Sequence, residues 1–589
     1  MSASQRQALS PFAVAFRSCR RHFAGAAVFS GLLNLLYLAP TIYMLQVYDR
    51  VVPTRGVTTL VLLTVIFVVS VATLSLLDYL RAGLLVRASA RLDRQLAGQV
   101  LRALMSQPNA LPQSSAAMRE FDTLRQAMTG TGILALFDAP WTPIYIAVCF
   151  LLHPALGGLA AGGAIVLLAL AVLNERATKK PMQRANEAAS RAYASLDSSI
   201  ASAGVLRALG MRDAMIQRHL SERQVSLHLQ AESSFAASVY MTLTKFTRIA
   251  LQSLSLGLGA YLAIEQKISP GSIFAASLLI GRALGPIELV LGAWKSVVQA
   301  MGALQGLKTL FAQADLDRTH TKLPDLVGAV QLERVSLVSP TRDRLLVGDV
   351  TFSLEPGEML GIIGPSGAGK STLVKLMAGA LLPSQGAIRF DGSDAKDWDE
   401  DQLARHIGYV PQETGLLQGT VKENITRFRT YLDGDTEALD AAAIAAAKLC
   451  GAHEMIARLP NGYDTRLGLG GTGLSAGQAQ RIALARALFD KPSVVLMDEP
   501  NAFLDAVGEQ TLALAIGRLR QNKVTVVVVA HRTNILADVD KLMLMRDGRI
   551  ELFGPREEVM QRLASARPSG PVQVPTPGRP GPRPAALGA

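Results

Sequence analysis

The sequence predicts an all-α membrane domain of six spans, followed by an α/β domain that carries a phosphate-binding loop. Apolar runs close to the ~20 residues that cross a bilayer as one helix occur only before residue 300. From Val330 onward, short β-branched runs alternate with helical stretches, as in α/β domains. The stretch "GIIGPSGAGKST" follows one of these runs and precedes a helical stretch.

The length, composition and net charge indicate a chain that is part membrane and part cytoplasmic. Its 589 residues are too many for one hydrophobic core, and apolar residues make up 49% with a mean hydropathy of +0.27. The net charge of +12 fits arginine-rich cytoplasmic loops. A soluble ATPase acting on DNA would have to place six apolar runs in water, so no nucleic acid partner is predicted. Cys19, Cys149 and Cys450 lack metal-ligand or CxxC spacing, and we expect free thiols.

The six expected spans are joined by alternately short and long connections. Arginines and lysines gather in the long connections, which places these connections and both termini in the cytoplasm. Residues 1–22 form a basic cytoplasmic segment without a cleavable signal, because no small-residue cleavage site closes the first apolar run. The spans are expected at residues 24–47, 57–79, 132–152, 156–173, 246–264 and 272–297.

The expected domain boundaries follow these changes in composition. Residues 23–300 form the membrane domain, whose long connections continue the spans as cytoplasmic helices; independent soluble bundles are the alternative for these connections. Residues 301–328 are expected to form a polar helical connector, and residues 329–565 the α/β domain. Residues 566–589 are rich in Pro and Gly, cannot bury a core, and are expected to be disordered.

The phosphate-binding loop matches GxxxxGK[ST]. In such a loop the backbone N–H groups surround phosphate oxygens, and the following helix directs its positive end at them. Lys370 can reach the β- and γ-phosphates, and the Ser371 hydroxyl can bind Mg²⁺. We expect the nucleotide to be held by Gly364, Pro365, Ser366, Gly367, Ala368, Gly369, Lys370, Ser371 and Thr372.

A second stretch, "VVLMDEP", supplies carboxylates for the same chemistry. Its apolar residues predict a buried strand that ends at Asp498, which would hold the Mg²⁺ shell. Glu499 follows directly, where a carboxylate could polarise the attacking water. On its own the pair could be a charge cluster at a helix start; together with Lys370 it predicts nucleotide hydrolysis.

A third stretch, "LSAGQAQRIALARAL", begins with a short turn that opens a helix, which suggests a second anion site. With this stretch the chain resembles the ATP-binding cassette (ABC) family, in which two cassettes bind head to tail and each closes over the ATP of the other. The resemblance implies ATP and Mg²⁺ as cofactors. It assigns Ser475, Gly477 and Gln478 to the partner's nucleotide.

The resemblance also implies roles for three more residues. Gln412 in "GYVPQET" would sense Mg²⁺ and the membrane domain, and Asp505 in "NAFLD" would line the dimer interface. His531 in "VVVVAHR" would contact the γ-phosphate. The chain departs from the family at Ala476 and Ala479, where glycine and arginine are usual, and near Ser339, where an adenine-stacking aromatic is usual. We therefore expect other apolar contacts to adenine and modest nucleotide affinity.

The membrane half carries a narrower resemblance. "FDAPWTPIYI", "YLAPTIYMLQVYDRVVPT" and "GRALGPIELVLGAWK" resemble the exporters of bacterial type I secretion systems, especially the PrtD-like group. The resemblance implies a type I ABC exporter fold in the inner membrane, working as a homodimer among membrane lipids. It further implies a periplasmic membrane-fusion adaptor, a TolC-like outer-membrane channel, and an unfolded cargo protein with an uncleaved C-terminal signal. Such cargoes are RTX-like proteases, lipases, haem-binding proteins and surface-layer proteins.

Several alternatives remain open from the sequence. A lipid or small-molecule exporter of the same fold and a regulatory ATPase that transports nothing both fit the motifs. A peptidase domain is not expected, since about 22 residues precede the first span. Asp138 is expected to cap a helical turn beside Pro140, or else to contact substrate. Arg282 and Glu288 would line the path or pair across helices.

Overall fold

The computed structural model describes residues 3–106, 114–314, 323–339, 344–432, 435–530 and 535–565. It consists of two compact units, Met1–Arg318 and Thr319–Ala589. The described part of the first is helical, and that of the second is α/β. His531 and the expected tail at residues 566–589 lie outside the described residues.

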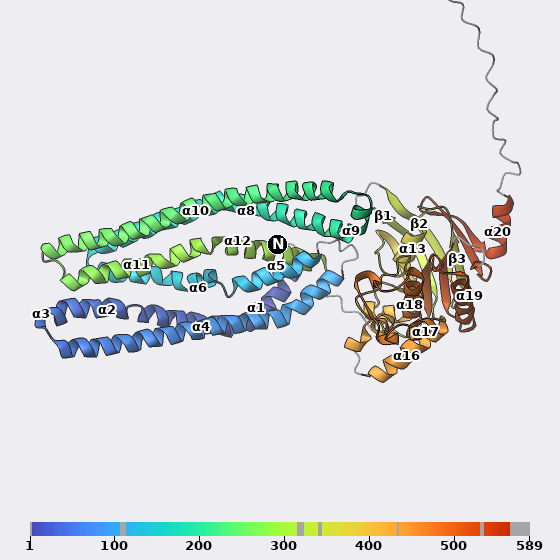
Figure 1. Cartoon of the computed structure of the whole chain (residues 1–589), viewed down its shortest axis with the longest axis horizontal. Coiled ribbons are helices and arrows are strands. Elements are labelled where there is room, and N and C mark those ends of the chain that lie inside the picture. The colour runs from blue at the N-terminus through green and yellow to red at the C-terminus, as the bar shows by residue number, and fades with distance from the viewer. Residues whose placement is uncertain are drawn as a thin grey trace, which may run out of the picture. The chain divides into compact units, whose positions relative to one another are not determined.

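The first unit, called the helical unit below, is built from long helices that run side by side. Figure 1 shows α1 beside α4 and α8 beside α10, and both pairs are in contact along their lengths. Its elements are α1 (Ala3–Leu36), α2 (Ala39–Gln46), the π-helical turn η1 (Val47–Val51), α3 (Val52–Thr54), α4 (Val57–Met105), α5 (Ser114–Ala127), α6 (Thr131–Asp138), the 3₁₀ turn η2 (Ala139–Trp141), α7 (Thr142–Leu152), α8 (Pro154–Ala201), α9 (Ala203–Ala208), α10 (Arg212–Ile264), α11 (Pro270–Gly292) and α12 (Trp294–Gln313).

Five helical segments among the described residues are long and apolar enough to cross a membrane: Phe12–Thr54, Val57–Met105, Thr131–Leu152, Pro154–Ala201 and Pro270–Gly292. The expected span at residues 246–264 is the C-terminal part of α10 and is not among them, because polar residues such as Arg248 and Gln252 lower its hydropathy. It packs against α8 and α11, so a sixth long helix belongs to the bundle.

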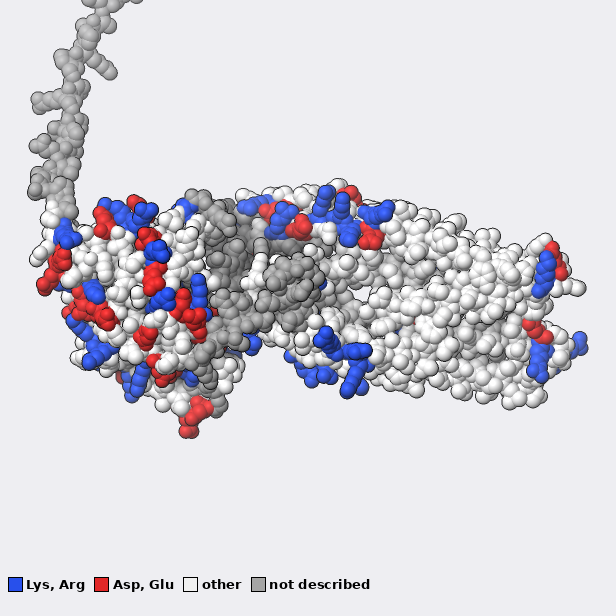
Figure 2. Space-filling view, turned by 180° about the vertical axis from the view of Figure 1, so that it is seen from behind, with Lys and Arg blue, Asp and Glu red and all other residues white. Residues whose placement is uncertain are grey.

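The surface of the helical unit fits a bilayer. In Figure 2 the face in view carries charged side chains near the ends of this unit and few between them. On α4, large apolar side chains such as Val61, Ile66 and Val69 are more than half exposed. Water does not favour such a continuous apolar surface, whereas lipid does.

The segment around Asp138 forms a kink inside one span. Helix α6 ends at Asp138, η2 follows, and α7 resumes at Thr142. Pro140 and Pro143 lie in the first positions of η2 and α7, where a missing N–H costs little. The expectation that Asp138 caps this turn is wrong: its side chain makes no capping hydrogen bond, because buried donors on other helices occupy it.

Helix α12 runs without a break through the boundary expected at residue 300 and packs in the helical unit. Its Leu307 and Phe311 share a core with Phe12 and Cys19 of α1 and with Leu92 of α4. Part of the expected connector is therefore an apolar helix of the bundle. The three cysteines of the chain are free and buried, as expected.

The second unit, called the cassette below, contains a six-stranded sheet in the order β12-β11-β3-β10-β9-β6 and a four-stranded antiparallel sheet in the order β2-β1-β4-β5. In the larger sheet, β3, β6, β9, β10 and β11 run parallel, so their carboxyl ends share one edge. The strands are β1 (Val330–Val338), β2 (Leu345–Leu354), β3 (Met359–Ile363), β4 (Gln385–Phe390), β5 (Ser393–Asp394), β6 (Ile407–Val410), β7 (Gly419–Thr420), β8 (Arg466–Leu467), β9 (Val494–Asp498), β10 (Thr525–Val529), β11 (Lys541–Arg546) and β12 (Arg549–Pro555).

Helices cover the larger sheet and form two cores with it. One core joins β9 and β10 to α16, α18 and α19, and the other joins the same strands to α13 and the four-stranded sheet. Because both faces are covered, β9 and β10 are buried throughout, and their sequences read as unbroken apolar runs. The helices are α13 (Lys370–Met377), α14 (Glu400–His406), α15 (Val421–Ile425), α16 (Thr436–Leu449), α17 (His453–Ala457), α18 (Ala476–Leu488), α19 (Ala506–Gln521) and α20 (Arg556–Ser565).

Candidate nucleotide-binding and hydrolysis site

The larger sheet of the cassette brings the expected catalytic segments to one edge. Val410 at the end of β6 pairs with Met497 of β9, and Asp498 at the end of β9 pairs with Val529 of β10. The phosphate-binding loop follows β3, which is the neighbour of β10 on its other side. Ligands of open α/β sheets bind beyond the carboxyl ends of the strands, so this edge is the candidate site.

The phosphate-binding loop needs glycine at two positions. Gly364 has a φ of 149° and Gly369 a φ of 90°. A Cβ atom at Gly364 would lie 2.2 Å from the Met545 carbonyl oxygen, and one at Gly369 would lie 2.7 Å from the Leu346 carbonyl oxygen. The loop can therefore close tightly in front of α13, whose free N–H groups favour phosphate.

The Lys370 side chain lies over its own loop. Its Nζ donates hydrogen bonds to the carbonyl oxygens of Gly364, at 2.9 Å, and Pro365, at 2.8 Å. Lys370 is 5% exposed, and burial lowers the pKa of its ammonium, while Glu499 and Asp498 act in the opposite direction. A buried cation satisfied by two carbonyl oxygens can exchange them for phosphate oxygens, which pair with its charge.

Ser371 and Asp498 meet across the loop and the sheet. The Ser371 hydroxyl donates to Asp498 Oδ1 at 3.0 Å. Asp498 is fully buried, and its Oδ2 has no hydrogen-bond partner among the described residues. Burial raises the pKa of this carboxyl, and the Ser371 hydrogen bond opposes that rise. An orphaned buried carboxylate oxygen beside a hydroxyl is the donor set that a hard cation such as Mg²⁺ prefers.

Glu499 follows Asp498 in an uncommon backbone conformation. Its φ is 49°, in the left-handed region, and its N–H donates to the Val529 carbonyl oxygen at 3.0 Å. This turn at the strand end leaves the Glu499 side chain half-buried beside the site. Left-handed backbone in a residue other than glycine is uncommon and is found at functional sites.

Gln412 lies two residues beyond β6 at the same edge, and its side chain is exposed. Arg486 of α18 stabilises the loop that carries Gln412. It donates to the carbonyl oxygens of Thr414, at 2.6 Å, and Gly415, at 2.9 Å. Burial lowers the pKa of the Arg486 guanidinium. Sequence reasoning missed this residue, because no local signal links an arginine near the end of a helix to a loop far earlier in the chain.

The start of α18 is closed by its own side chains. Ser475 Oγ accepts from the Gln478 N–H at 3.3 Å, and Gln478 Oε1 accepts from the Ser475 N–H at 2.9 Å, which is a capping box. Ser475 remains exposed. A Cβ atom at Gly477 would lie 3.0 Å from the Phe503 carbonyl oxygen, so α18 approaches the segment after β9 closely.

Further contacts join α18 to this segment. Gln480, which is 2% exposed, donates to the Pro500 carbonyl oxygen at 3.2 Å, and Arg481 Nη2 donates to Asp505 Oδ1 at 3.0 Å. Asp505 also caps α19 by accepting the Gly508 N–H at 2.8 Å. The Gly508 hydrogen bond lowers the Asp505 pKa most, burial opposes it, and the Arg481 charge lowers the pKa further. Sequence reasoning missed the roles of Gln480 and Arg481.

The predicted site residues thus fall into two groups. The phosphate-binding loop, Asp498, Glu499 and Gln412 share one edge of the sheet. Within the described residues, Ser475, Gln478 and Asp505 make no hydrogen bond to that loop. Ser339, where an aromatic residue would be usual, is half-buried, and its N–H donates to the Arg344 carbonyl oxygen at 2.9 Å.

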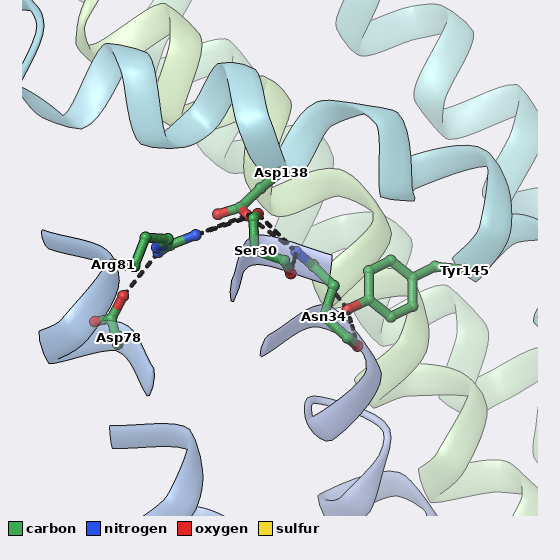
Figure 3. Close-up of polar contacts among 6 residues, drawn as sticks. All are labelled: Ser30, Asn34, Asp78, Arg81, Asp138 and Tyr145. Atoms are coloured by element: carbon green, nitrogen blue, oxygen red, sulfur yellow. Dashed lines mark hydrogen bonds and ion pairs between the residues drawn. The ribbon is translucent and has the colours of Figure 1, made fainter. Parts of the chain in front are cut away.

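The helical unit contains a separate polar network around Asp138 (Figure 3). Asp138 Oδ1 accepts from Arg81 Nη1 at 2.9 Å, from Asn34 Nδ2 at 2.9 Å and from the Ser30 hydroxyl. Tyr145 donates its hydroxyl to the Asn34 carbonyl oxygen at 2.8 Å. The network joins α1, α4, α6 and α7, and Asp138 itself accepts from donors on two other helices, α1 and α4.

The charges expected in the last span have different partners. Glu288 Oε2 lies 2.6 Å from Arg248 Nε of α10, an ion pair in which the N–H is not aligned for a hydrogen bond. The Arg282 guanidinium lies 3.8 Å from the centre of the Tyr37 ring, a cation–π contact. Glu288 therefore contacts α10, and Arg282 contacts the turn between α1 and α2.

Comparisons with known proteins agree with both halves of this description. A model of the ABC transporter transmembrane region matches residues 24–287, and an ABC transporter model matches residues 347–502. The chain is 40% identical over 569 residues to the type I secretion system ATP-binding protein PrsD of Rhizobium meliloti (strain 1021), with 96% of each chain covered. It is 27% identical to the leukotoxin export ATP-binding protein LtxB of Aggregatibacter actinomycetemcomitans, covering 92% of this chain and 77% of that protein.

The fold also matches a solved structure. A bacterial Atm1-family ABC exporter with ATP bound superposes with a TM-score of 0.80 at 23% identity, covering 92% of this chain and 97% of that chain. This similarity shows a helical exporter membrane domain followed by an ABC cassette. Together with the 40% identity over nearly the whole length, it places the sequence in one family. The chain belongs to the ABC transporters of type I secretion systems.

Proposed function

We propose that this multi-pass inner-membrane ATPase works as a homodimer that exports an unfolded protein with an uncleaved C-terminal signal. The observation that carries the proposal is the similarity of the whole chain, membrane half included, to a type I secretion ATP-binding protein. A relative named for leukotoxin export supports cargo of the RTX type. The partners would be a periplasmic adaptor and an outer-membrane channel of the TolC type.

In the proposed hydrolysis, Lys370 leaves its two loop carbonyl oxygens and binds the β- and γ-phosphates of ATP. Glu499, at the turn after β9, holds the attacking water and accepts its proton. Gln412, which follows the neighbouring strand β6, would reach toward the same centre, and His531 would contact the γ-phosphate. The loop residues from Gly364 to Thr372 other than Pro365, which has no N–H, would hold the phosphates through their backbone N–H groups.

The site suits Mg²⁺ bound together with ATP. Ser371 Oγ and the two carboxylate oxygens of Asp498 would hold it, with Gln412 at the edge, because Asp498 Oδ2 has no partner among the described residues. The ion would neutralise charge on the phosphates. The fold already places Ser371 Oγ and Asp498 Oδ1 3.0 Å apart.

The second group of residues supports a dimer. Ser475 and Gln478 satisfy each other at the start of α18, and among the described residues they make no hydrogen bond to the phosphate loop of their own chain. We infer that Ser475, Gly477, Gln478 and Asp505 act on the nucleotide of a second copy. Gln480 and Arg481 couple them to the Glu499 turn through Pro500 and Asp505. Hydrolysis at one site would then loosen the contact made by the other copy.

A deletion strain tests the function. The chromosomal copy is removed, and the proteins of the culture medium are compared with those of the parent by mass spectrometry. We expect at least one protein to disappear from the medium and accumulate in the cell, and the wild-type chain to restore it. An unchanged medium would contradict protein export, and ATPase activity stimulated by lipids alone would favour the lipid exporter.

Complementation with two variants links export to the site. Glu499→Gln removes the water-orienting carboxylate, and we expect ATP turnover to fall about 10²–10⁴-fold and export to stop. Glu557→Gln, on the exposed first turn of α20, is the matched control and should restore export. Equal export by both variants would remove Glu499 from the proposed role.

A further inference from the structure

The helical unit contains a cavity of about 190 Å³ between α8, α10 and α12, and no residue of the Asp138 network lines it. Its α10 residues recur at helical spacing and so lie on one face of that helix. The same spacing applies to its residues on α8 and α12. The cavity is lined by Met182, Ala185, Asn186, Ala189, Ser226, Gln230, Ser233, Ser234, Lys295 and Gln299.

The lining of the cavity has a definite chemistry. Seven of the ten residues are polar, one is a cation, and none is acidic. The amide groups of Asn186, Gln230 and Gln299 can both donate and accept hydrogen bonds. Lys295 is exposed, and no described carboxylate lies within ion-pair distance of it. The cavity therefore offers amide groups and one cation without an ion-pair partner in the described ranges, which suits a ligand that has both amides and negative charge.

Ser233 is the independent sign of a ligand. It is 2% exposed, and its hydroxyl has no hydrogen-bond partner among the described residues. A buried hydroxyl without a partner costs free energy, and folded proteins seldom retain one unless water or a ligand satisfies it.

The cavity lies where a cargo would enter. Lys295 is in the first turn of α12, directly after α11, the last candidate span, ends at Gly292. On α8, Met182 follows the apolar run at residues 156–173 by nine residues, or about 14 Å along the helix. The cavity thus lies beyond the apolar runs on the side of the long, arginine-rich connections, which is the cytoplasmic side.

We propose that this cavity binds an extended, carboxylate-bearing segment of the exported polypeptide before it enters the membrane. The inference rests on the proposed function, because it names the cargo site of that same transporter. Lys295 pairs with the carboxylate, and the three amide side chains pair with backbone N–H and C=O groups. Ser233 supplies one further hydrogen bond. The volume accommodates only a short extended stretch, which matches a chain that is exported unfolded.

The first test measures ATPase activity in proteoliposomes against the concentration of the cargo, meaning the protein that the deletion strain fails to release. Lys295→Gln should raise the cargo concentration for half-maximal stimulation about tenfold, the effect of losing one charge-assisted hydrogen bond. Ser233→Ala should raise it severalfold, and Lys295→Arg should stay near wild type. Basal ATPase activity should not change in any of them.

Matched controls separate cargo binding from general damage. Lys308→Gln removes a lysine of the same helix that does not line the cavity, and Ser238→Ala removes a serine of α10 whose hydroxyl bonds the Phe235 carbonyl oxygen at 2.8 Å. Both should keep the wild-type cargo dependence. The proposal is overturned if Lys295→Gln and Ser233→Ala also keep it while the cargo still stimulates the wild-type chain. Absence of stimulation in the wild type would instead contradict the proposed function.

Two further arms identify the ligand. A photocrosslinking amino acid at Gln230 should capture the cargo, and one at Ser238 should not. Cargo amidated at its C-terminus tests whether the terminal carboxylate binds Lys295. Cargo in which Asp and Glu are replaced by neutral residues tests the side-chain carboxylates. One of these two altered cargoes should bind about tenfold more weakly than the unaltered cargo. ATPase activity is also compared between phosphatidylglycerol and phosphatidylcholine vesicles. If Lys295→Gln changes only the stimulation by phosphatidylglycerol, the cavity binds a lipid headgroup and the proposal is wrong.

Discussion

Arg81 of α4 and Asp138 at the end of α6 form a buried ion pair, with Nη1 2.9 Å from Oδ1 and side chains 6% and 15% exposed. Figure 3 shows how Ser30 and Asn34 of α1 complete the shell around the carboxylate. The pair is therefore a polar junction between the α1–α4 helices and the kinked α6–α7 segment. A buried charge of this kind depends strongly on its partner.

We predict that Asp138→Asn lowers the stability of the helical unit. Asparagine keeps an acceptor for Arg81 but not the charge, and we expect a loss of about 2 kcal/mol, below the 3–5 kcal/mol that follows complete removal of a buried partner. The measurement is thermal unfolding in detergent, with Asp78→Asn as the control. Asp78 pairs with the same arginine at 2.7 Å, but its side chain is 52% exposed, so its change should stay within about 1 kcal/mol. Equal losses in the two variants would contradict the buried junction.

We predict that Asp498→Asn abolishes ATP hydrolysis yet stabilises the nucleotide-free cassette. Burial raises the pKa of Asp498, so the folded state binds a proton more tightly than the unfolded chain does. Wild-type stability then falls as the pH rises from the ordinary carboxyl pKa, about 3.9, to the raised folded value, and stays lower above it.

The pH dependence of thermal unfolding measures this effect. Asparagine carries no proton equilibrium, so the gain of Asp498→Asn over wild type should be complete at neutral pH and should vanish in acid below the ordinary carboxyl pKa. Asp490→Asn, in the exposed turn between α18 and β9 and outside the site, is the control and should show no such gain at neutral pH. A wild-type chain more stable than Asp498→Asn at pH 7 without nucleotide would show that the carboxylate is satisfied in the fold.

We predict that Asp49→Ala loosens the start of α11. Asp49, in the π-helical turn, accepts from the Ser269 hydroxyl at 2.5 Å and from the Gly271 N–H at 2.7 Å. Losing an acceptor at a helix N-terminus costs about 1 kcal/mol. Hydrogen exchange at residues 270–274 should speed up about fivefold, whereas Asp49→Asn, which keeps an acceptor, should remain near wild type. Unchanged exchange in Asp49→Ala would show that Ser269 alone caps the helix.

We predict that Ser339→Tyr strengthens ATP binding. An aromatic ring at this position would stack on adenine, and base–aromatic stacking contributes about 1–3 kcal/mol. The KM for ATP should fall at least fivefold. The KM for ribose 5′-triphosphate, which lacks the base, should change little. Ser339→Val is the control for added apolar area without stacking. If the KM for ATP does not move in the tyrosine variant, adenine does not lie at this position.

Much of the nucleotide site was predictable because its signals are local. The strand–loop–helix pattern around Lys370 and the apolar run before Asp498 each fit within a few residues, and parallel strands then bring their ends together. The Ser475–Gln478 capping box also has a local signature, serine followed three residues later by glutamine. Arg486 had no such signature, since its partners at Thr414 and Gly415 lie far away in the chain.

The membrane half shows the opposite case. The sequence marked Asp138, Arg282 and Glu288 as unusual charges but could not name their partners, and it assigned Asp138 to a cap that it does not make. The span at residues 246–264 was expected from its apolar residues, although its composition alone does not reach that of the other five. Its place beside α8 and α11 comes from packing.

By itself, the sequence determined that this chain joins a helical membrane domain to an ATP-hydrolysing cassette, because span length, strand pattern and glycine-rich loops are short-range properties. Only the tertiary structure decided that Asp138 pairs with Arg81 and that Glu288 pairs with Arg248. It also decided that Ser233 is buried with no hydrogen-bond partner in the part of the chain that the structure describes. These facts depend on which helices lie side by side. A buried polar group is satisfied by whatever the packing of distant segments brings to it, and no local pattern encodes that choice.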